Sequence, residues 1–413
     1  MKIGILRERK SIPDSRTPLN PVQAAFLRDQ LDIDIVVEAS PNRCFTNEEY
    51  VQLNVPVVTD LSDRDVLMGV KEVPVEHLQP GKVYFFFSHT MKKQPYNRAL
   101  LQAILEKEIR LIDYELLTNM HGQRLIAFGH FAGMVGAHNA LWTWGTRTGH
   151  FMLPRLKDLE NYDVAKDQYL GMHWPNIKIV LTGTGRVGTG ALLTLQDMGI
   201  RQVEPATFLQ SSFSEAVFTQ LLPHHYAADK SGDPFDKSLF YNNPSAFKSI
   251  FFPFAAVSDI MINGIYWLPG APAFFSKEEM RHPDFRIQVI SDITCDIAPV
   301  SSIPSSLRTA SIDDPVFGYD PISEREVEPY QSGVVDMMTV SNLPNELPRE
   351  SSKAFGKQFI TAIMGELMKN EPSGMLERAT VAEQGRLKPA FSYLQDWVDG
   401  KEDELVMVDH ASS

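Results

Sequence analysis

Four ionisable residues each follow a short apolar run in the first part of the chain. The residues and their runs are Arg7 after Ile3–Leu6, Lys71 after Val66–Val70, His89 after Val83–Phe87, and Glu115 after Leu111–Ile112. A lysine, a histidine and a carboxylate that lie together can pass protons to and from a substrate. The competing explanation is that the ends of strands are exposed to water and are polar for that reason alone.

The segments around these residues predict a parallel sheet. Several of the apolar runs are rich in β-branched residues, which favour strands, and Ile33–Val37 is another such run. Pro95–Lys107 instead carries Leu100, Leu101 and Ile104 at helical spacing. Continuous apolar strands that alternate with helices are typical of a parallel sheet covered on both faces. In such a sheet the ligand site lies beyond the carboxyl ends of the strands, which is where the four ionisable residues are placed.

A second α/β unit begins near Gly136. Its predicted strands are Ile177–Leu181, Ile260–Ile262 and Ile287–Ile290. Residues 350–370 carry Phe355, Phe359, Ile363 and Leu367 at helical spacing, which predicts an amphipathic helix. We expect this helix to return to the first unit.

The predicted fold class is therefore α/β, with two Rossmann-like domains that contain parallel sheets and have a cleft between them. The expected substrate and catalytic domain is discontinuous and comprises residues 1–135 with about 335–413. The dinucleotide-binding domain comprises residues 136–334. The residues from about Gly400 onward are acidic, then small and polar, and are expected to be frayed.

The clearest local motif is the strand–loop–helix run Ile177–Gly199. Gly183 permits a tight turn, Gly185 allows a pyrophosphate to approach the backbone, and Gly188 allows helix and strand to pack closely. The helix N-terminus then offers free N–H groups and a positive dipole end to the phosphates. The loop residues expected to contact the cofactor are Gly183, Gly185, Arg186, Val187 and Gly188.

The acidic residue that usually binds the adenosine ribose is missing. We predict the next strand over Gln202–Leu209, which runs into Gln210, Ser211 and Ser212. A carboxylate there would bind the ribose 2′-hydroxyl and repel a 2′-phosphate. Its absence favours NADP over NAD, with Ser211, Ser212 or Arg186 as phosphate contacts.

Composition limits the other ligands. The net charge of −13 argues against a general affinity for nucleic acid or anionic lipid, and no apolar run is long enough to span a membrane. Cys44 and Cys295 are distant from each other, and no metal-binding spacing is present, so we expect no metal. The charged start of the chain is unlike a secretory signal, and a cytoplasmic protein is expected. The oligomeric state stays open.

With these residues in view, the chain resembles the lysine-forming saccharopine dehydrogenases, within the alanine dehydrogenase and transhydrogenase superfamily. The strongest likeness is to the lysine–2-oxoglutarate reductase half of the bifunctional aminoadipic semialdehyde synthases. It covers nearly the whole chain to about residue 370. The segments that carry it are Arg16-Thr17-Pro18-Leu19, Gly69-Val70-Lys71-Glu72, Phe86-Phe87-Ser88-His89-Thr90, Arg110-Leu111-Ile112-Asp113-Tyr114-Glu115, Ala127-Phe128-Gly129, Ala132-Gly133, Thr182-Gly183-Thr184-Gly185, Ile262-Asn263-Gly264-Ile265-Tyr266-Trp267 and Asn342-Leu343-Pro344.

The resemblance implies a role for each matched residue. Lys71 and His89 fall on the family's acid–base pair. The residues that fall on substrate-binding positions, or beside the pair, are Arg16, Arg124, Phe128, Glu72 and Glu115. Arginines suit a substrate with several carboxylates, because a guanidinium can bind each carboxylate through two hydrogen bonds. The segment that contains Asn263 and Tyr266 is expected beside the nicotinamide. Ser341 departs from the family, which usually has Asp before Asn-Leu-Pro.

The implied reaction is reversible condensation of L-lysine with 2-oxoglutarate to give saccharopine. It needs a base to deprotonate the lysine ε-amine and an acid to expel water. Lys71 can serve only if burial or positive charge lowers its pKa. Structural explanations stay open: His89 at a core margin, Lys71 paired with Glu72 at the surface, and Arg16 bound to a carboxylate of the protein itself.

Two other functions also remain open. Another amino-acid dehydrogenase of the alanine dehydrogenase type would share the Arg, Lys and His residues. A nucleotide-binding regulatory protein that has lost catalysis would be expected to show broken catalytic positions, whereas Arg16, Lys71, His89 and the glycine loop are intact.

Overall fold

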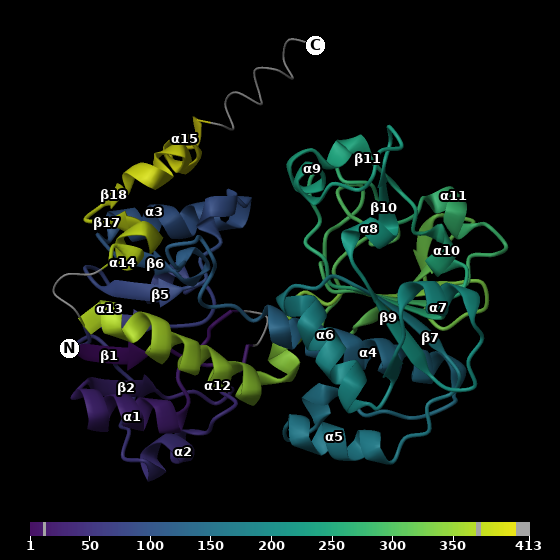
Figure 1. Ribbon diagram of the computed structural model, residues 1–413. Helices are drawn as coiled ribbons and strands as arrows, with labels where there is room; N and C mark the ends of the chain where they lie inside the picture. Colours follow the sequence, from purple (N-terminus) through teal and green to yellow (C-terminus); the bar gives the residue numbers. More distant parts are fainter. Residues whose placement is uncertain (11–13, 369–372, 402–413) are drawn as a thin grey trace. The chain divides into compact units, whose positions relative to one another are not determined.

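The computed structural model describes residues 1–10, 14–368 and 373–401. The chain divides into two compact units, unit 1 with residues 1–127 and those from 348 onward, and unit 2 with residues 128–347. The first unit is drawn in purple, blue and yellow in Figure 1, and the second in teal and green. The division falls just before a long helix that starts at Gly129 and just before one that starts at Pro348. The expected boundaries were near residues 135 and 335. The tail after Lys401, expected to be frayed, lies outside the described residues.

Unit 1 is built on an eight-stranded sheet in the order β18-β17-β6-β5-β4-β1-β2-β3. Strands β1 to β6 run parallel, and β17 and β18 add an antiparallel edge. The strands are β1 (Lys2–Ile5), β2 (Asp34–Glu38), β3 (Val57–Val58), β4 (Val66–Met68), β5 (Val83–Phe86), β6 (Arg110–Asp113), β17 (Thr380–Glu383) and β18 (Arg386–Leu387). The helices are α1 (Pro21–Leu31), α2 (Asn47–Gln52), α3 (Arg98–Glu106), α12 (Pro348–Gln358), α13 (Met364–Met368), α14 (Met375–Ala379) and α15 (Gln395–Val398).

The helices of unit 1 begin where local chemistry favours them. Asn20 caps α1 by accepting from the Gln23 N–H, Gln23 bonds back to the Asn20 N–H, and Pro21 is the first helical residue. The predicted helix in residues 350–370 is observed as α12, a π-helical turn (Phe359–Ile363) and α13. It packs on unit 1, since the Phe359 ring lies 5.7 Å from that of Phe85 in β5.

Unit 2 has an eight-stranded sheet in the order β15-β14-β16-β13-β12-β7-β9-β8, in which β14 runs antiparallel to both of its neighbours and the other strands share one direction. Its strands are β7 (Lys178–Thr182), β8 (Arg201–Gln202), β9 (Val217–Leu221), β12 (Ile260–Asn263), β13 (Val289–Asp292), β14 (Val316–Asp320), β15 (Arg325–Val327) and β16 (Val335–Met338), and β10 (Ala227–Asp229) and β11 (Phe247–Ser249) form a separate antiparallel pair. Its helices are α4 (Gly129–Thr148), α5 (Tyr162–Leu170), α6 (Arg186–Asp197), α7 (Pro205–Gln210), α8 (Pro223–Tyr226), α9 (Lys237–Asn242), α10 (Phe252–Ala255) and α11 (Lys277–Met280). The prediction of two Rossmann-like domains with parallel sheets is confirmed.

Strand β7 shows why its sequence is continuously apolar. Ile179 and Leu181 pack into the apolar cluster that includes α4 and α6, whereas Val180 packs into the cluster on the other face of the sheet. Both faces of the strand are therefore buried, as expected for the centre of a parallel sheet.

Two glycines let α4 and α6 touch at the backbone. A Cβ on Gly133 would lie 1.9 Å from the Val187 carbonyl oxygen, and one on Gly190 would lie 1.9 Å from that of His130. Any larger residue would force the helices apart. Helix α6 carries the glycine loop at its start, so this contact fixes the position of the loop.

Candidate active site

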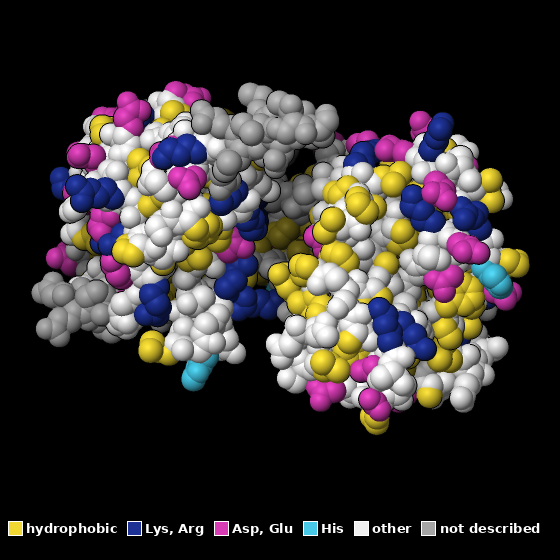
Figure 2. Space-filling model, turned by 90° about the horizontal axis from the view of Figure 1, so that it is seen from above, with side chains coloured by type: hydrophobic (Ala, Val, Ile, Leu, Met, Phe, Trp, Pro, Cys, Tyr) yellow, Lys and Arg dark blue, Asp and Glu magenta, His cyan; other side chains and the backbone are white. Residues whose placement is uncertain are grey.

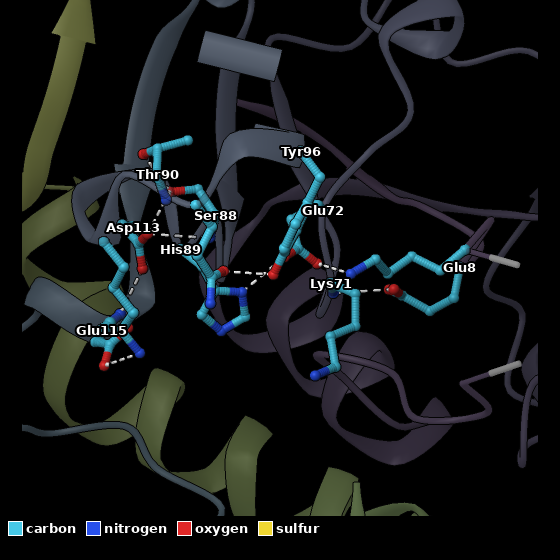
Figure 3. A network of polar contacts seen from close by, with 12 residues as sticks. Glu8, Lys71, Glu72, Ser88, His89, Thr90, Tyr96, Asp113 and Glu115 are labelled. Carbon is cyan, nitrogen blue, oxygen red and sulfur yellow. Dashed lines mark hydrogen bonds and ion pairs between the residues drawn. The ribbon is translucent and has the colours of Figure 1, made fainter. Parts of the chain in front are cut away.

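Lys71, Glu72 and His89 lie together at the carboxyl edge of the unit 1 sheet (Figure 3). Strands β4 and β5 pair in parallel with Met68 opposite Phe85, so the turns that follow them are neighbours. Glu72 Oε1 is 2.6 Å from His89 Nδ1, and Glu72 Oε2 is 2.7 Å from Lys10 Nζ. Burial alone would raise the pKa of Glu72, but the contacts with His89 and Lys10 outweigh it and lower this pKa to about 2. The ionised carboxylate can only accept, so His89 donates from Nδ1 and Nε2 is left for a ligand.

The Lys71 side chain is mostly buried beside this pair. Burial lowers its pKa below the usual value, and the positive charges of Arg16 and Lys10 lower it further. No hydrogen bond or ion pair of its Nζ atom is found with the described residues. The required condition for Lys71 to exchange protons, a lowered pKa, is therefore met.

The turn that carries His89 has an uncommon backbone. His89 has a φ of 52°, in the left-handed region that non-glycine residues rarely adopt. Asp113, at the end of β6, accepts hydrogen bonds at Oδ2 from the Ser88 N–H (3.0 Å) and the Ser88 hydroxyl (2.5 Å). Its Oδ1 accepts from the Glu115 N–H at 2.7 Å. One fully buried carboxylate thus ties the turns that carry His89 and Glu115.

Two residues of this site were not predicted, Glu8 and Asp113. Glu8 accepts from the backbone N–H groups of Val70 (2.7 Å) and Lys71 (2.9 Å) and so anchors the turn before Glu72. Burial, followed by the negative charge of Asp14, raises the pKa of Glu8 to about 7. Glu8 lies just past the end of β1, and Asp113 is the last residue of β6. A carboxylate at the end of an apolar run is the sequence signal that could have identified both residues.

Other predicted residues occupy different places in unit 1. Arg16 is buried and binds Asp14 through Nε (3.0 Å) and Nη2 (2.6 Å), so it contacts a carboxylate of the protein itself, as one explanation predicts. Glu115 lies 3.3 Å from Lys92 Nζ and 3.5 Å from Arg124 Nη1. Arg7 is exposed, with Nε 3.9 Å from Glu38.

The predicted glycine loop of unit 2 has the expected geometry. Gly183 has a φ of 94°, and a Cβ on it would lie 2.4 Å from the Gly264 carbonyl oxygen. A Cβ on Gly188 would lie 2.1 Å from the Gly183 carbonyl oxygen. A Cβ on Gly185 would meet nothing within 4 Å, so the backbone there is open to a ligand. Helix α6 begins at Arg186, next to this open backbone, and a helix N-terminus is a general binding site for anions.

A cavity of about 360 Å³ adjoins this loop. Four of the five predicted loop residues line it, namely Gly183, Gly185, Arg186 and Val187, and so does Tyr266. Gly188 is instead packed against the loop backbone. The residues present thus fit a dinucleotide, because an open backbone, a helix N-terminus and a cavity meet at one place.

Asn263 does not line the cavity. It is fully buried at the end of β12, where its Nδ2 group donates to Asp292 and Ser302, both at 2.9 Å. Its Oδ1 accepts from the Thr182 hydroxyl at 2.8 Å. Asn263 therefore joins the ends of β7, β12 and β13. Of the remaining predicted residues, Phe128 immediately precedes α4, and Ser341 is exposed after β16.

The predicted position of the adenosine-ribose residue is wrong. Residues 205–210 form helix α7, not a strand, and the two neighbours of β7 are β9 and β12, which both follow later in the chain. The Lys178 ammonium lies 3.2 Å from the Ser211 carbonyl oxygen, which places Ser211 at the amino end of β7. The glycine loop follows the carboxyl end, so Ser211 and Ser212 cannot contact a phosphate there. Strand β9 ends at Leu221, and no acidic residue follows it before Asp229.

No helix in the described ranges is long and apolar enough to cross a membrane. In the same ranges, no three His, Cys, Asp or Glu side chains are grouped so that they could hold a metal ion.

Comparison with known proteins identifies a family that unit 1 resembles. Residues 4–135 match the family described as alanine dehydrogenase/PNT, N-terminal domain. This part of the chain is therefore similar to that domain. Its fold is similar to that of an L-alanine dehydrogenase structure, with a TM-score of 0.67, 18% identity, and coverage of 96% of this chain and 100% of the other. The resemblance to this superfamily is confirmed.

Curated relatives extend the similarity over most of the chain. The mitochondrial alpha-aminoadipic semialdehyde synthase of Rattus norvegicus is 27% identical over 97% of this chain and 48% of its own length. The saccharopine dehydrogenase [NAD(+), L-lysine-forming] of Schizosaccharomyces pombe is 26% identical over 87% of this chain and 91% of its own length. The chain thus spans about half the length of the first of these relatives.

Proposed function

We propose that this chain catalyses the reversible reductive condensation of L-lysine with 2-oxoglutarate, with NADPH preferred over NADH. In the reductive direction lysine, 2-oxoglutarate, NADPH and one proton give saccharopine, NADP⁺ and water. The observation that carries the proposal is the arrangement at the carboxyl edge of unit 1. There, burial and the charge of Arg16 lower the pKa of Lys71, and Lys71 lies beside the Glu72–His89 pair.

His89 and Lys71 would divide the proton transfers. The ε-amine of lysine has a pKa near 10.4 in water, so it must lose a proton before it attacks the oxo carbon. His89 can accept this proton at Nε2, because Nδ1 is bonded to Glu72. The carbinolamine then expels water, and the Lys71 ammonium can protonate the leaving hydroxyl. Its lowered pKa makes that proton easier to donate.

The nicotinamide cofactor would supply the hydride that reduces the resulting imine to a secondary amine. Gly183, Gly185 and the start of α6 would hold the pyrophosphate, with Arg186 beside it. The preference for NADPH rests on the end of β9, where no carboxylate is present to repel a 2′-phosphate. The name of the Schizosaccharomyces relative specifies NAD(+), so this preference distinguishes the proposal from that protein.

Arg16 and Arg124 would bind substrate carboxylates. Saccharopine carries three carboxylates and 2-oxoglutarate two, which matches the presence of several cations around Lys71. Arg16 is bound to Asp14, so a substrate carboxylate must share or replace that contact. Phe128 and Glu115 are proposed to complete the substrate site, and small molecules are the only partners proposed.

Initial rates with paired substrates test the proposal. We expect turnover with lysine plus 2-oxoglutarate, and a lower KM for NADPH than for NADH. Turnover with pyruvate plus ammonia alone would place the chain among alanine dehydrogenases and refute the proposal. Cofactor binding without turnover across a panel of amino and oxo acids would indicate a non-catalytic nucleotide-binding protein.

A further inference from the structure

The cavity beside the glycine loop is partly bounded by a segment that a dinucleotide-binding sheet does not require. Between β9 and β12 the chain forms α8, the antiparallel pair β10–β11 and helix α9. We call residues 223–249 the inserted segment. It has an apolar cluster of its own, formed by Ala227, Phe240 and Phe247, with Phe235 packed against them. This cluster gives the segment a defined shape and fixes the position of α9.

The place of the cavity identifies the part of a dinucleotide that would occupy it. It is lined by the glycine loop after β7, by Leu221 and Pro223 after β9, and by residues 264–268 after β12. Strands β9 and β12 are the two neighbours of β7. In a sheet of this kind the pyrophosphate lies at the central loop, so a cavity that reaches the end of β9 corresponds to the adenosine side.

The chemistry of the lining favours a flat aromatic ligand. Six aromatic side chains line the cavity, namely Tyr226, Phe240, Tyr241, Tyr266, Trp267 and Phe274, and Arg186 is the one charged residue among the described lining residues. Figure 2 views the side of unit 2 that carries α9, and hydrophobic side chains are visible on it.

Two of these rings are largely exposed, Tyr266 after β12 and Tyr241 in α9, and Tyr241 is the one that belongs to the inserted segment. The side chain of Tyr241 is 49% exposed, whereas the adjacent Phe240 is 6% exposed and lies in the cluster of the inserted segment. Their ring centroids are 5.6 Å apart. A half-exposed ring at the wall of a cavity, held by a buried neighbour, is a platform for a base, because every base has a π-face that can stack.

We propose that the inserted segment recognises the adenine of the cofactor and that Tyr241 stacks on the adenine ring. This inference rests on the proposed function, because it takes the ligand to be a nicotinamide dinucleotide. Recognition by stacking supplies affinity for the adenosine half at a site where the usual ribose carboxylate is absent. Most of the binding free energy of the cofactor would then come from the adenine and the pyrophosphate. A fragment that contains both groups should therefore bind although it lacks the nicotinamide.

Calorimetric titration of the full chain tests this assignment with three probes: NADPH, ADP-ribose, and reduced nicotinamide mononucleotide, which lacks the adenosine. We expect Tyr241→Ala to weaken NADPH and ADP-ribose binding by about 5- to 100-fold, the range for loss of one stacking aromatic. Binding of the mononucleotide should not change, and in turnover assays the KM for NADPH should rise. Tyr241→Phe keeps the ring and should bind like the unaltered chain, and Tyr241→Leu should weaken binding as Ala does.

Phe26→Ala is the matched control, because Phe26 is also a half-exposed aromatic, 45% exposed on α1 in unit 1. It should leave all three affinities unchanged. Unchanged ADP-ribose affinity in both Tyr241→Ala and Tyr241→Leu would overturn the assignment while the proposed function stands. Failure of the unaltered chain to bind either NADPH or ADP-ribose would overturn both.

Discussion

The two units repeat one kind of sheet and use the same edge of it for different chemistry. In unit 1 the turns after β4, β5 and β6 present Lys71, His89 and Glu115. In unit 2 the turns after β7 and β12 present Gly183 and Gly264, and β9 ends in Leu221. The carboxyl edge of a parallel sheet is therefore a general platform, and its chemistry depends on the residues that follow the strands.

The two units also differ in the physical property that each edge uses. Unit 1 changes proton affinity by burial, which lowers the pKa of Lys71 and raises that of Glu8 to about 7. Unit 2 brings backbone atoms close together and leaves space beside Gly185. Unit 1 should therefore be sensitive to the loss of functional groups, and unit 2 to the addition of atoms.

The largest effect is expected from the acid–base pair. Lys71→Met and His89→Gln should each lower kcat with lysine and 2-oxoglutarate by about 10²–10⁴-fold, because general acid–base groups contribute that much. Both variants should bind NADPH like the unaltered chain, since neither residue is in unit 2. Near-normal turnover in both variants would refute the assignment of chemistry to unit 1.

Two alanine substitutions in the glycine loop test the role of space. In Gly185→Ala the new methyl group meets no protein atom within 4 Å, so the melting temperature should be unchanged. NADPH affinity should nevertheless fall, by about tenfold or more, because the methyl group occupies ligand space. In Gly188→Ala the methyl group would lie 2.1 Å from a carbonyl oxygen, and stability should fall by about 1–3 kcal/mol. Equal changes in melting temperature for the two variants would contradict the assignment of Gly185 to ligand space and of Gly188 to packing.

Between pH 6.5 and about 4, a loss of stability is expected in unit 2. His138 is fully buried between Tyr169 and the Pro154 carbonyl, and burial lowers its pKa to about 4 from 6.5. The unfolded chain then binds a proton that the folded chain does not, so stability is full above pH 6.5 and is lost as the pH falls to about 4. The maximum loss is about 3 kcal/mol.

Hydrogen exchange at pH 4.5 and 7 measures this loss, after correction for the intrinsic exchange rate. In His138→Gln the amide can still accept from Tyr169 and donate to Pro154, and the protection of α4 and α5 should depend less on pH. An unchanged pH dependence would show that other groups cause it.

A smaller effect is expected from Asp113, which positions His89 without touching the substrate. Both carboxylate oxygens of Asp113 accept hydrogen bonds, so in Asp113→Asn the new NH₂ group faces another donor and one hydrogen bond is lost. A hydrogen bond to a charged group is worth about 1.5 kcal/mol, and its loss should lower kcat about tenfold. The KM for NADPH should not change.

Asp259→Asn is the matched control, because Asp259 is also a buried carboxylate that accepts from a backbone N–H, that of Lys178, but at the amino edge of unit 2. It should lower stability and leave kcat unchanged. An equal loss of kcat in both variants would assign Asp113 to general stability.

Local patterns in the sequence determined the strands β1, β2, β4 to β7, β12 and β13, the glycine loop, and the grouping of Lys71 and His89. These features follow from short-range physics: β-branched runs form strands, glycine permits close turns, and the carboxyl ends of parallel strands meet at one edge. Glu72 beside His89 also follows, because the two residues lie in the turns after neighbouring strands.

Tertiary structure alone decided which strand lies beside β7. Along the chain β8 follows α6, yet β8 lies at the outer edge of the sheet and β9 lies between it and β7. Strand order depends on contacts between distant segments, which no local pattern records, and for this reason the ribose position was assigned wrongly. The contacts of Glu8 with Lys71 and of Asp113 with Ser88, and the pairing of Arg16 with Asp14, likewise depend on side-chain packing that emerges only when the chain is folded.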